Sequence, residues 1–273
     1  MPEGHTVHRL ARDHSQEFVG QRMIVTSPQG RFAEEAEELS GRYLLDVEAI
    51  GKHLIYQWGQ RRKTTARRPS PTKIMHVHLG LYGKFRLHGN PAPEPRGAVR
   101  VRMIGKQKSF DLNGPNCCEL LTPQQFAALQ QRLGQDPLRE DADPELAWQK
   151  ISKSRRVIGA LLLDQSIIAG LGNIYRAEVL WLLKIHPERK GTEVSREEFD
   201  TIWELSVKLL RIGLKYDRII TVSREMVDKP LSRLSRQERL LIYKKSRCRT
   251  CNRKVRWWEV GSRKMYACEK CQT

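Results

Sequence analysis

Residues 162–175 read LLDQSIIAGLGNIY and lead from one apolar stretch, 158–169, into another, 174–183. Both stretches repeat hydrophobic residues at helical spacing, which predicts two helices. Gly170 and Gly172 allow a tight, irregular connection between them, and Asn173 is suited to cap the second helix. The free amides at the start of that helix suit a phosphate group. An ordinary helix–turn–helix connection without a ligand explains the same residues equally well.

The sequence on either side of this segment is also helical. Ser195 and Glu198 form a capping box at the start of an amphipathic stretch, 195–214. Thr122 is followed by Pro and Gln at the positions that begin a helix, so we predict a helix from residue 123 to about Leu133. Residues 134–137, Gly-Gln-Asp-Pro, end this helix and indicate a hinge between domains.

The N-terminal half is predicted to be mainly β. Residues 42–58, 73–88 and 99–103 are rich in alternating apolar residues, and 60–71 and 90–97 have the composition of loops. A helix over 6–18 would turn His8, Leu10 and Ala11 inward. Short strands joined by turns favour a sandwich or a flattened barrel. We therefore expect an α+β protein of two domains, with an N-terminal β-sandwich and flanking helices followed by a helical C-terminal domain.

The expected boundaries follow from these changes in pattern. We predict a β-sandwich domain over 1–122, an interdomain helix and hinge over 123–137, a helical domain over 138–235 and a metal-binding module over 236–273.

The chain is strongly basic. Its 273 residues contain 49 Lys and Arg against 31 Asp and Glu, a net charge of +18. Thirteen basic residues and only three acidic ones lie between Arg233 and the C-terminus. Such an excess attracts polyanions, of which nucleic acid is the commonest, although solubility or an anionic membrane would also explain it. The chain has no apolar run of membrane-spanning length and no signal peptide, so we expect a cytoplasmic protein without a membrane partner.

Four of the six cysteines lie at the C-terminal end. Cys248 and Cys251 are separated by two residues, sixteen residues follow, and Cys268 and Cys271 repeat the spacing. Two such pairs joined by a β-hairpin complete a tetrahedral zinc shell, and four thiolates leave no open position. We therefore predict one structural Zn²⁺ ion. Cys117 and Cys118 are adjacent and are predicted to be buried core residues.

The N-terminus offers a nucleophile. Met1 is normally removed before a residue as small as Pro, which would give Pro2 a free secondary amine. An α-amino group titrates near neutrality, so part of it is an uncharged nucleophile at cellular pH, and Glu3 is placed to act as general acid or base. Many inert chains begin with the same residues, so this feature by itself is a weak indication.

Taken together, these motifs resemble the formamidopyrimidine-DNA glycosylase and endonuclease VIII family. The residues that carry the resemblance are Pro-Glu-Gly at 2–4, the interdomain segment 132–138, the segment 162–175, and the closing cysteines with Gln272. They occur in the family's order along essentially the whole chain. The resemblance implies a helix–two-turn–helix motif, a four-cysteine zinc finger and a bifunctional enzyme of base excision repair. Such an enzyme is a DNA glycosylase and an apurinic/apyrimidinic (AP) lyase that cleaves by β,δ-elimination.

The resemblance also implies roles for individual residues. Pro2 would form the Schiff base and Glu3 would be the acid or base. Lys52 matches a lysine that contacts the phosphate beside the lesion and aids catalysis. Asn173, in the turn that contains Gly172, matches an asparagine that binds a backbone phosphate. Arg263 matches the zinc-finger arginine that holds phosphates beside the flipped nucleotide.

A second set of residues bears on the lesion. Leu81 and Tyr82 match the side chains that fill the gap left by the flipped nucleotide, and this pair resembles the endonuclease VIII branch. We therefore expect oxidised pyrimidines in duplex DNA as the substrate of a monomeric enzyme, with oxidised purines as the alternative. Gly80, where endonuclease VIII has Gln, weakens that choice, and Thr6 replaces a carboxylate of many relatives.

Two further questions stay open at this point. The basic loop 61–68 is longer than usual and either adds phosphate contacts or is a tolerated insertion. The third functional hypothesis is a DNA-binding protein that has lost catalytic activity, and the presence of Pro2, Glu3 and Lys52 argues against it.

Overall fold

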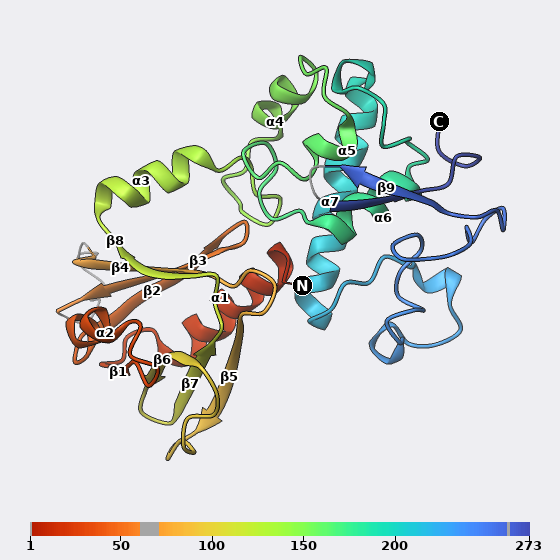
Figure 1. Ribbon diagram of the computed structural model, residues 1–273. Coiled ribbons are helices and arrows are strands. Elements are labelled where there is room, and N and C mark those ends of the chain that lie inside the picture. Colours follow the sequence, from red (N-terminus) through yellow and green to blue (C-terminus); the bar gives the residue numbers. More distant parts are fainter. Residues whose placement is uncertain (1, 61–70, 261–262) are drawn as a thin grey trace. The chain divides into compact units, whose positions relative to one another are not determined.

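The computed structural model describes residues 2–60, 71–260 and 263–273. Contacts between residues divide the chain into two compact units. The first contains Pro2 and Val7–Arg132, and the second contains Glu3–Thr6 and Leu133–Thr273 (Figure 1). The finer division at residues 122, 137 and 235 stays a prediction, and the basic loop 61–68 lies outside the described residues.

The first unit is a sandwich of two antiparallel four-stranded sheets, as predicted. One sheet has the order β2-β3-β4-β8, with β2 (Tyr43–Ile50), β3 (His53–Gly59), β4 (Lys73–His78) and β8 (Cys117–Leu121). The other has the order β1-β6-β7-β5, with β1 (Ile24–Thr26), β6 (Val99–Ile104), β7 (Lys108–Asn113) and β5 (Lys84–Gly89). Three helices accompany them: α1 (Gly4–Phe18), α2 (Ala33–Leu39) and α3 (Pro123–Arg132).

The predicted β segments are subdivided in the structure. The segment 42–58 is the hairpin β2–β3, and 73–88 contains β4 and β5, which belong to different sheets. The chain changes sheet at Gly80, whose φ of +64° is left-handed and favours glycine. Strands β1, β7 and β8 were not predicted. Cys117 and Cys118 lie on β8 and are only partly buried, so their prediction as buried core residues was wrong, because β8 is the last strand of its sheet.

Helix α1 packs its buried residues against the core between the two sheets. They recur at helical spacing as Val7, Ala11, His14 and Phe18, whereas His8 and Leu10 are only half-buried, which corrects the predicted inner face. The His14 ring stacks on Phe110 with ring centroids 4.4 Å apart. Its Nδ1 lies 2.7 Å from the Tyr56 hydroxyl, and burial lowers the pKa of His14 to about 4.

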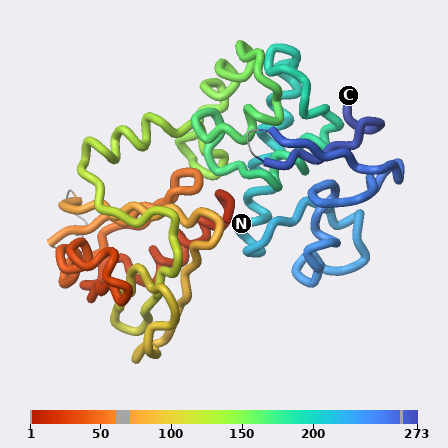
Figure 2. The backbone as a smooth tube through the Cα atoms, viewed as in Figure 1, coloured from red at the N-terminus to blue at the C-terminus, as the bar shows by residue number. Residues whose placement is uncertain are grey.

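The second unit is mainly helical. Its helices are α4 (Pro144–Ile151), α5 (Ile158–Leu161), α6 (Asn173–Leu182) and α7 (Arg196–Tyr216), with short 3₁₀ helices η1 (Gly191–Glu193), η2 (Arg224–Met226) and η3 (Leu231–Arg233). A β-hairpin of β9 (Arg256–Val260) and β10 (Arg263–Ala267) follows, and β10 packs along α6 (Figure 2). No helix in the described part of the chain is long and apolar enough to cross a membrane.

Two capping predictions are confirmed and one helix is shorter than predicted. Ser195 and Glu198 form the reciprocal capping box of α7, and Thr122 and Gln125 do the same at α3. The predicted helix over 158–169 was wrong beyond Leu161. The Asp164 carboxylate accepts hydrogen bonds from the amide and hydroxyl of Ser166, at 3.0 and 2.7 Å. These local bonds favour a turn, because they compete with the helical backbone pattern.

Candidate active site and metal centre

The carboxylate of Glu3 lies at the N-terminus of helix α6. The amide of Ile174 donates to Oε1 at 3.0 Å, and the amide of Tyr175 lies 3.5 Å from Oε2. The Glu3 side chain is fully buried. A helix start has unsatisfied amides and a partial positive charge, both of which favour a carboxylate. The acid that follows Pro2 is therefore positioned by backbone groups from a distant part of the sequence.

Three glycines make room for this contact. A Cβ atom at Gly172 would lie 2.3 Å from Cδ of Glu3, so no larger residue fits there while Glu3 stays in place. Gly170 has a φ of +93°, and its carbonyl accepts a hydrogen bond from the amide of Gly4 at 2.8 Å. A Cβ at Gly4 would lie 2.8 Å from Cα of Gly170. The glycines that predicted a tight connection therefore also admit the N-terminal residues.

Asn173 does not cap α6, so that prediction was wrong. Gly172 occupies the N-cap position, and Glu3 accepts from the first amides. The Asn173 amide donates to the carbonyl of Lys264 at 3.0 Å and accepts from Nε of Arg176 at 3.0 Å. Asn173 is buried and links the start of α6 to β10.

Arg176 was not singled out from the sequence. Its side chain is fully buried, and Nη1 donates to the carbonyl of Gly159 at 2.6 Å. Nη2 lies 3.5 Å from the carbonyl of Arg263. Burial lowers the pKa of Arg176 to about 10. Arg176 and Asn173 thus contact the first residues of β10, where the Arg263 side chain is exposed.

Glu178 is a second buried charge on α6. It accepts hydrogen bonds from the amides of Leu241, Ile242 and Tyr243 at 2.7, 2.9 and 2.8 Å, and from the hydroxyl of Thr221. Burial raises its pKa. These bonds position the segment that leads into the first cysteine pair. Two charged residues within an otherwise apolar helical stretch were a signal in the sequence, because unpaired charges are rarely buried.

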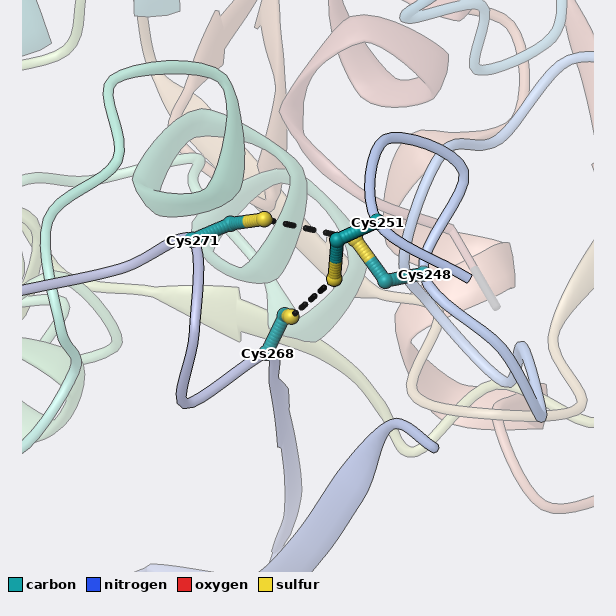
Figure 3. Close-up of side chains that lie close together, drawn as sticks. All are labelled: Cys248, Cys251, Cys268 and Cys271. Atoms are coloured by element: carbon teal, nitrogen blue, oxygen red, sulfur yellow. Dashed lines mark hydrogen bonds between the residues drawn. The ribbon is translucent and has the colours of Figure 1, made fainter. Parts of the chain in front are cut away.

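The four C-terminal cysteines form one cluster (Figure 3). Their sulfur atoms all lie within 4.8 Å of one another, with 3.9 Å between Cys248 and Cys271 and 3.4 Å between Cys251 and Cys268. Zinc–sulfur bonds of about 2.3 Å in a tetrahedron separate the sulfurs by roughly 3.8 Å. None of the four forms a disulfide bond. The cluster therefore fits a metal ion held by four thiolates.

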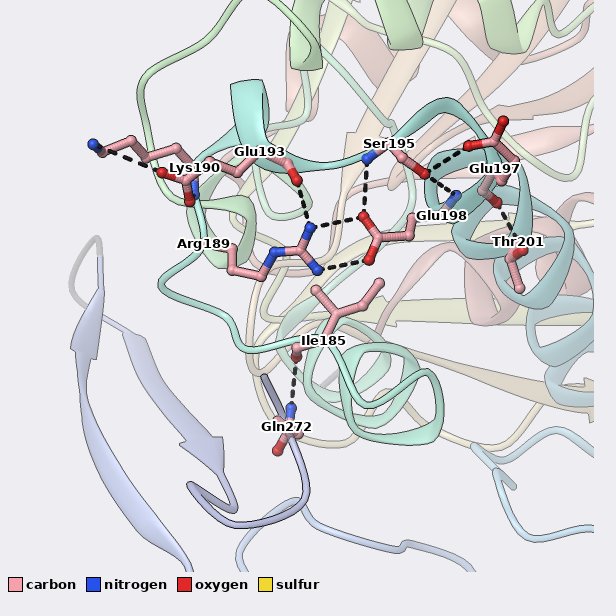
Figure 4. A network of polar contacts seen from close by, with 9 residues as sticks. All are labelled: Ile185, Arg189, Lys190, Glu193, Ser195, Glu197, Glu198, Thr201 and Gln272. Carbon is pink, nitrogen blue, oxygen red and sulfur yellow. Dashed lines mark hydrogen bonds and ion pairs between the residues drawn. The ribbon is translucent and has the colours of Figure 1, made fainter.

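Gln272 connects this cluster to the helical part of its unit. Its Oε1 accepts from the amide of Cys268 at 2.8 Å, and its Nε2 donates to the carbonyl of Ile185 at 2.9 Å. A few residues further along the chain, Arg189 forms a two-pronged ion pair with Glu198 at 2.6 and 2.8 Å (Figure 4). The segment that contacts Gln272 is thereby fixed to the start of α7.

The remaining predicted residues of the first unit lie in turns. Lys52 is partly buried in the turn between β2 and β3, where Gly51 has a φ of +60°. Leu81 and Tyr82 lie between β4 and β5 with exposed fractions of 47% and 84%. A Cβ at Gly80 would lie 2.7 Å from Cβ of Asn116, so the glycine that departs from the family's pattern is required by the local packing.

Pro2 and Thr6 lie close to Glu3 in the sequence. Pro2 is partly buried. The hydroxyl of Thr6 lies 3.2 Å from Nε2 of His5, and the His5 ring packs edge-on against Tyr175 with centroids 5.4 Å apart. Thr6 therefore bonds within the first turn of α1.

Comparisons with known proteins agree with this arrangement. Residues 1–115 match the formamidopyrimidine-DNA glycosylase N-terminal domain, and residues 133–225 match the H2TH domain of the same protein. Endonuclease 8 1 of Mycobacterium tuberculosis is 43% identical, with all of both chains covered. Formamidopyrimidine-DNA glycosylase of Lactococcus lactis subsp. lactis is 27% identical over 100% of this chain and 99% of its own.

Solved structures of a Lactococcus lactis Fpg are also similar. One is a complex with DNA containing N7-benzyl-Fapy-dG and another a complex with DNA containing an oxidised pyrimidine. Both have a TM-score of 0.78 and 26% identity and cover 99% of each chain. Because the two family domains match residues 1–115 and 133–225, and the 43% identity extends over the whole length, the chain belongs to the formamidopyrimidine-DNA glycosylase and endonuclease VIII family of bifunctional DNA glycosylases and AP lyases.

Proposed function

We propose that this enzyme removes oxidised bases from duplex DNA through a Schiff base on Pro2. The secondary amine of Pro2, exposed by loss of Met1, attacks C1′ of the damaged nucleotide. A C–N bond forms, and the base leaves with the electron pair of its glycosidic bond and takes up a proton. The resulting iminium acidifies the C2′ proton, and its removal expels the 3′-phosphate. A second elimination expels the 5′-phosphate.

Glu3 is assigned the proton transfers. The observation that carries the proposal is the buried Glu3 carboxylate, held by the amides of Ile174 and Tyr175 immediately after the nucleophile in sequence. A catalytic acid or base must be held within reach of the proton that it transfers. Backbone amides at a helix start provide such a fixed support, because they do not rotate as side chains do.

Three residues are assigned to phosphates. Lys52, which lies in the turn between β2 and β3, places its positive charge beside the phosphate next to the lesion. Arg263 presents an exposed guanidinium at the start of β10, whose backbone is contacted by the buried Arg176. Asn173 donates one amide hydrogen to Lys264, and its second hydrogen serves the phosphate next to the Gly172 turn.

Leu81 and Tyr82 are assigned to the space left by the flipped nucleotide. Two large apolar side chains exposed together at a turn support this role, since stacking bases offer them a partner that water does not. The 43% identity to an endonuclease 8 supports oxidised pyrimidines as the substrate class. Oxidised purines are the alternative, and the Lactococcus lactis Fpg has been solved in complexes with DNA of both kinds, which supports keeping both substrate classes in the test.

The four-cysteine cluster is assigned one structural zinc ion. Its sulfur spacing supports this metal, and four thiolate ligands leave no position for a substrate. The enzyme acts as a monomer in the cytoplasm, next to the chromosome, in keeping with the bacterial sources of its relatives.

Borohydride trapping tests the chemistry. Tag-free enzyme is incubated with duplexes that contain thymine glycol, 8-oxoguanine or an abasic site, and borohydride reduces any Schiff base to a stable crosslink. We expect a crosslink on Pro2, formed faster with thymine glycol than with 8-oxoguanine. Preference for 8-oxoguanine would assign the enzyme to oxidised purines. Absence of a crosslink on all three duplexes would overturn the proposal and leave a DNA-binding protein.

The N-terminus provides the matched control. Mass spectrometry of the N-terminal peptide establishes that Met1 is absent and that Pro2 is not acetylated. Pro2→Gly retains a primary amine and should keep part of the lyase activity while glycosylase activity falls. An unchanged glycosylase rate in Pro2→Gly would contradict the role of Pro2.

A further inference from the structure

A second group of metal-binding side chains lies in the first unit, on the sheet β2-β3-β4-β8. His76 on β4 pairs directly with Glu119 on β8, and Cys117 on β8 pairs with His78. Because side chains alternate along a strand, His76, Cys117 and Glu119 share one face of the sheet. The opposite face carries core residues such as Met75 and Val77. None of these residues belongs to the four-cysteine cluster.

The donor atoms of the three residues converge. Nδ1 of His76 lies 2.9 Å from Oε1 of Glu119 and 3.8 Å from Sγ of Cys117. The Cys117 sulfur is 3.1 Å from the same carboxylate oxygen. Zinc bonds of about 2.0–2.3 Å separate tetrahedral N, O and S ligands by roughly 3.4–3.6 Å. Shifts of about half an ångström in two flexible side chains would reach that geometry.

His53 supports the ring of His76. Its Nδ1 lies 2.8 Å from Nε2 of His76, the ring nitrogen that faces away from Glu119. If Nδ1 of His76 binds a metal ion, its Nε2 carries the proton and donates to His53. Histidine ligands in metal sites are commonly oriented by such a bond on their second nitrogen.

The cluster borders a pocket of about 270 Å³ between the outer face of the sheet and α3. His76 and Glu119 line it, together with Gln125, Leu129 and Arg132. Two of the three proposed ligands, His76 and Glu119, therefore border an open space. Zinc sites with three protein ligands keep a fourth position for water or another small ligand, and the pocket offers room for it on the side of these two residues. The guanidinium of Arg132 favours an anion in that position.

We propose that His76, Cys117 and Glu119 bind a second zinc-type divalent ion, with the fourth coordination position open to the pocket. The mixed nitrogen, sulfur and oxygen donor set suits Zn²⁺, and Co²⁺ replaces it with the same ligands. The thiolate and the carboxylate together balance the charge of the ion. His53 is a positioning residue that acts through His76.

Cobalt titration tests this site. The full-length enzyme in its zinc-loaded form is titrated with Co²⁺ and followed by its visible and thiolate-to-metal absorption, beside the variants Cys117→Ala and Cys118→Ala. Cys118 is the matched control because it is the next residue and its side chain is directed to the opposite face of the sheet. We expect one additional equivalent of Co²⁺ in the wild type and in Cys118→Ala, and loss of that equivalent in Cys117→Ala.

Two further variants keep the test decisive. Glu119→Gln should also lose the additional ion, and because its side chain is 49% exposed and keeps an oxygen that can accept a hydrogen bond, we expect the variant to fold. His53→Asn should weaken the binding by about 10- to 100-fold without abolishing it. Equal cobalt binding in Cys117→Ala and Cys118→Ala, or no cobalt signal beyond exchange into the four-cysteine cluster, would overturn the proposal.

Discussion

Replacing Gly172 by alanine should displace Glu3 from helix α6. The new Cβ would lie 2.3 Å from Cδ of Glu3 and 2.5 Å from Oε1, whereas non-bonded carbon atoms approach to about 3.5–4.0 Å. Because the space is filled by Glu3 itself, the carboxylate must leave the amides of Ile174 and Tyr175. A hydrogen bond to a charged group contributes about 1.5–3 kcal/mol. Loss of the 3.0 Å bond from Ile174 and of the longer contact from Tyr175 should therefore lower the free energy of unfolding by at least about that amount.

The catalytic effect should be larger than the effect on stability. A positioned acid or base contributes roughly 10²- to 10⁴-fold to rate, so base excision should slow by about 100-fold or more. The assay is single-turnover excision and strand cleavage on a lesion duplex, with denaturant unfolding of the same preparations. Gly89→Ala is the matched control, since a Cβ at Gly89 would have no atom within 4 Å, and it should behave as the wild type.

A double-variant cycle identifies the group that is displaced. Glu3→Gln keeps an oxygen that can accept from Ile174 but removes the charge and the acid–base function. If Gly172→Ala acts through Glu3, the effects of the two changes on rate will be far less than additive. A folded Gly172→Ala enzyme with the wild-type rate would refute the reasoning. If Gly172→Ala were less stable but excised bases at the wild-type rate, Glu3 would have a structural role and no catalytic one.

Four other outcomes are expected. Burial lowers the pKa of His14 from 6.5 to about 4, so as pH falls His14 is protonated in the unfolded chain before it is protonated in the folded chain. The free energy of unfolding should therefore drop by about 3 kcal/mol between pH 6.5 and 4. His14→Phe should flatten that part of the profile of unfolding free energy against pH. Arg263→Ala should weaken DNA binding and lower the slope of log affinity against log salt concentration by about 1, with the fold intact. A filter-binding salt series measures this slope. Lys270 is also exposed and follows β10, so Lys270→Ala is the charge-matched comparison. Removal of metal by a chelator should abolish DNA binding and unfold the hairpin, as followed by mobility shift and circular dichroism, and added Zn²⁺ should restore both. Glu178→Ala leaves three amides without their acceptor and should lower the free energy of unfolding by about 3 kcal/mol or more in urea titrations, whereas Glu197→Ala on the exposed surface of α7 should have little effect.

Features that depend on neighbouring residues were predictable from the sequence. The two cysteine pairs indicated the four-thiolate cluster, because ligands on one tight turn need only their spacing. The capping boxes at Thr122 and Ser195 marked the starts of α3 and α7 correctly, because each is a local hydrogen-bond exchange. Helix α4 has a comparable signal at Asp143, which accepts from the amide of Glu145, and it could have been found in the same way.

Local patterns failed where the backbone had a competing partner. The apolar residues after Leu161 have helical spacing, yet the Asp164 side chain bonds to Ser166 and the chain turns instead. Asn173 is a residue type that often caps a helix, but the Glu3 carboxylate accepts from the first amides of α6, and the Asn173 side chain donates to the carbonyl of Lys264 instead. In both cases a side chain forms a hydrogen bond with a partner that the local pattern does not specify.

By itself, the sequence determined the class of fold and the four clustered cysteines, because alternation, capping and ligand spacing are short-range properties of the chain. The family followed from the resemblance of its motifs, taken in order along the chain, to those of known proteins. Only the tertiary structure decided that Glu3 binds to the start of α6, that Arg176 and Glu178 fix β10 and the segment before the cysteines, and that His76 meets Cys117 and Glu119. Those contacts join residues far apart in sequence. They depend on strand register and on the packing of buried charges against backbone groups, which no local pattern encodes.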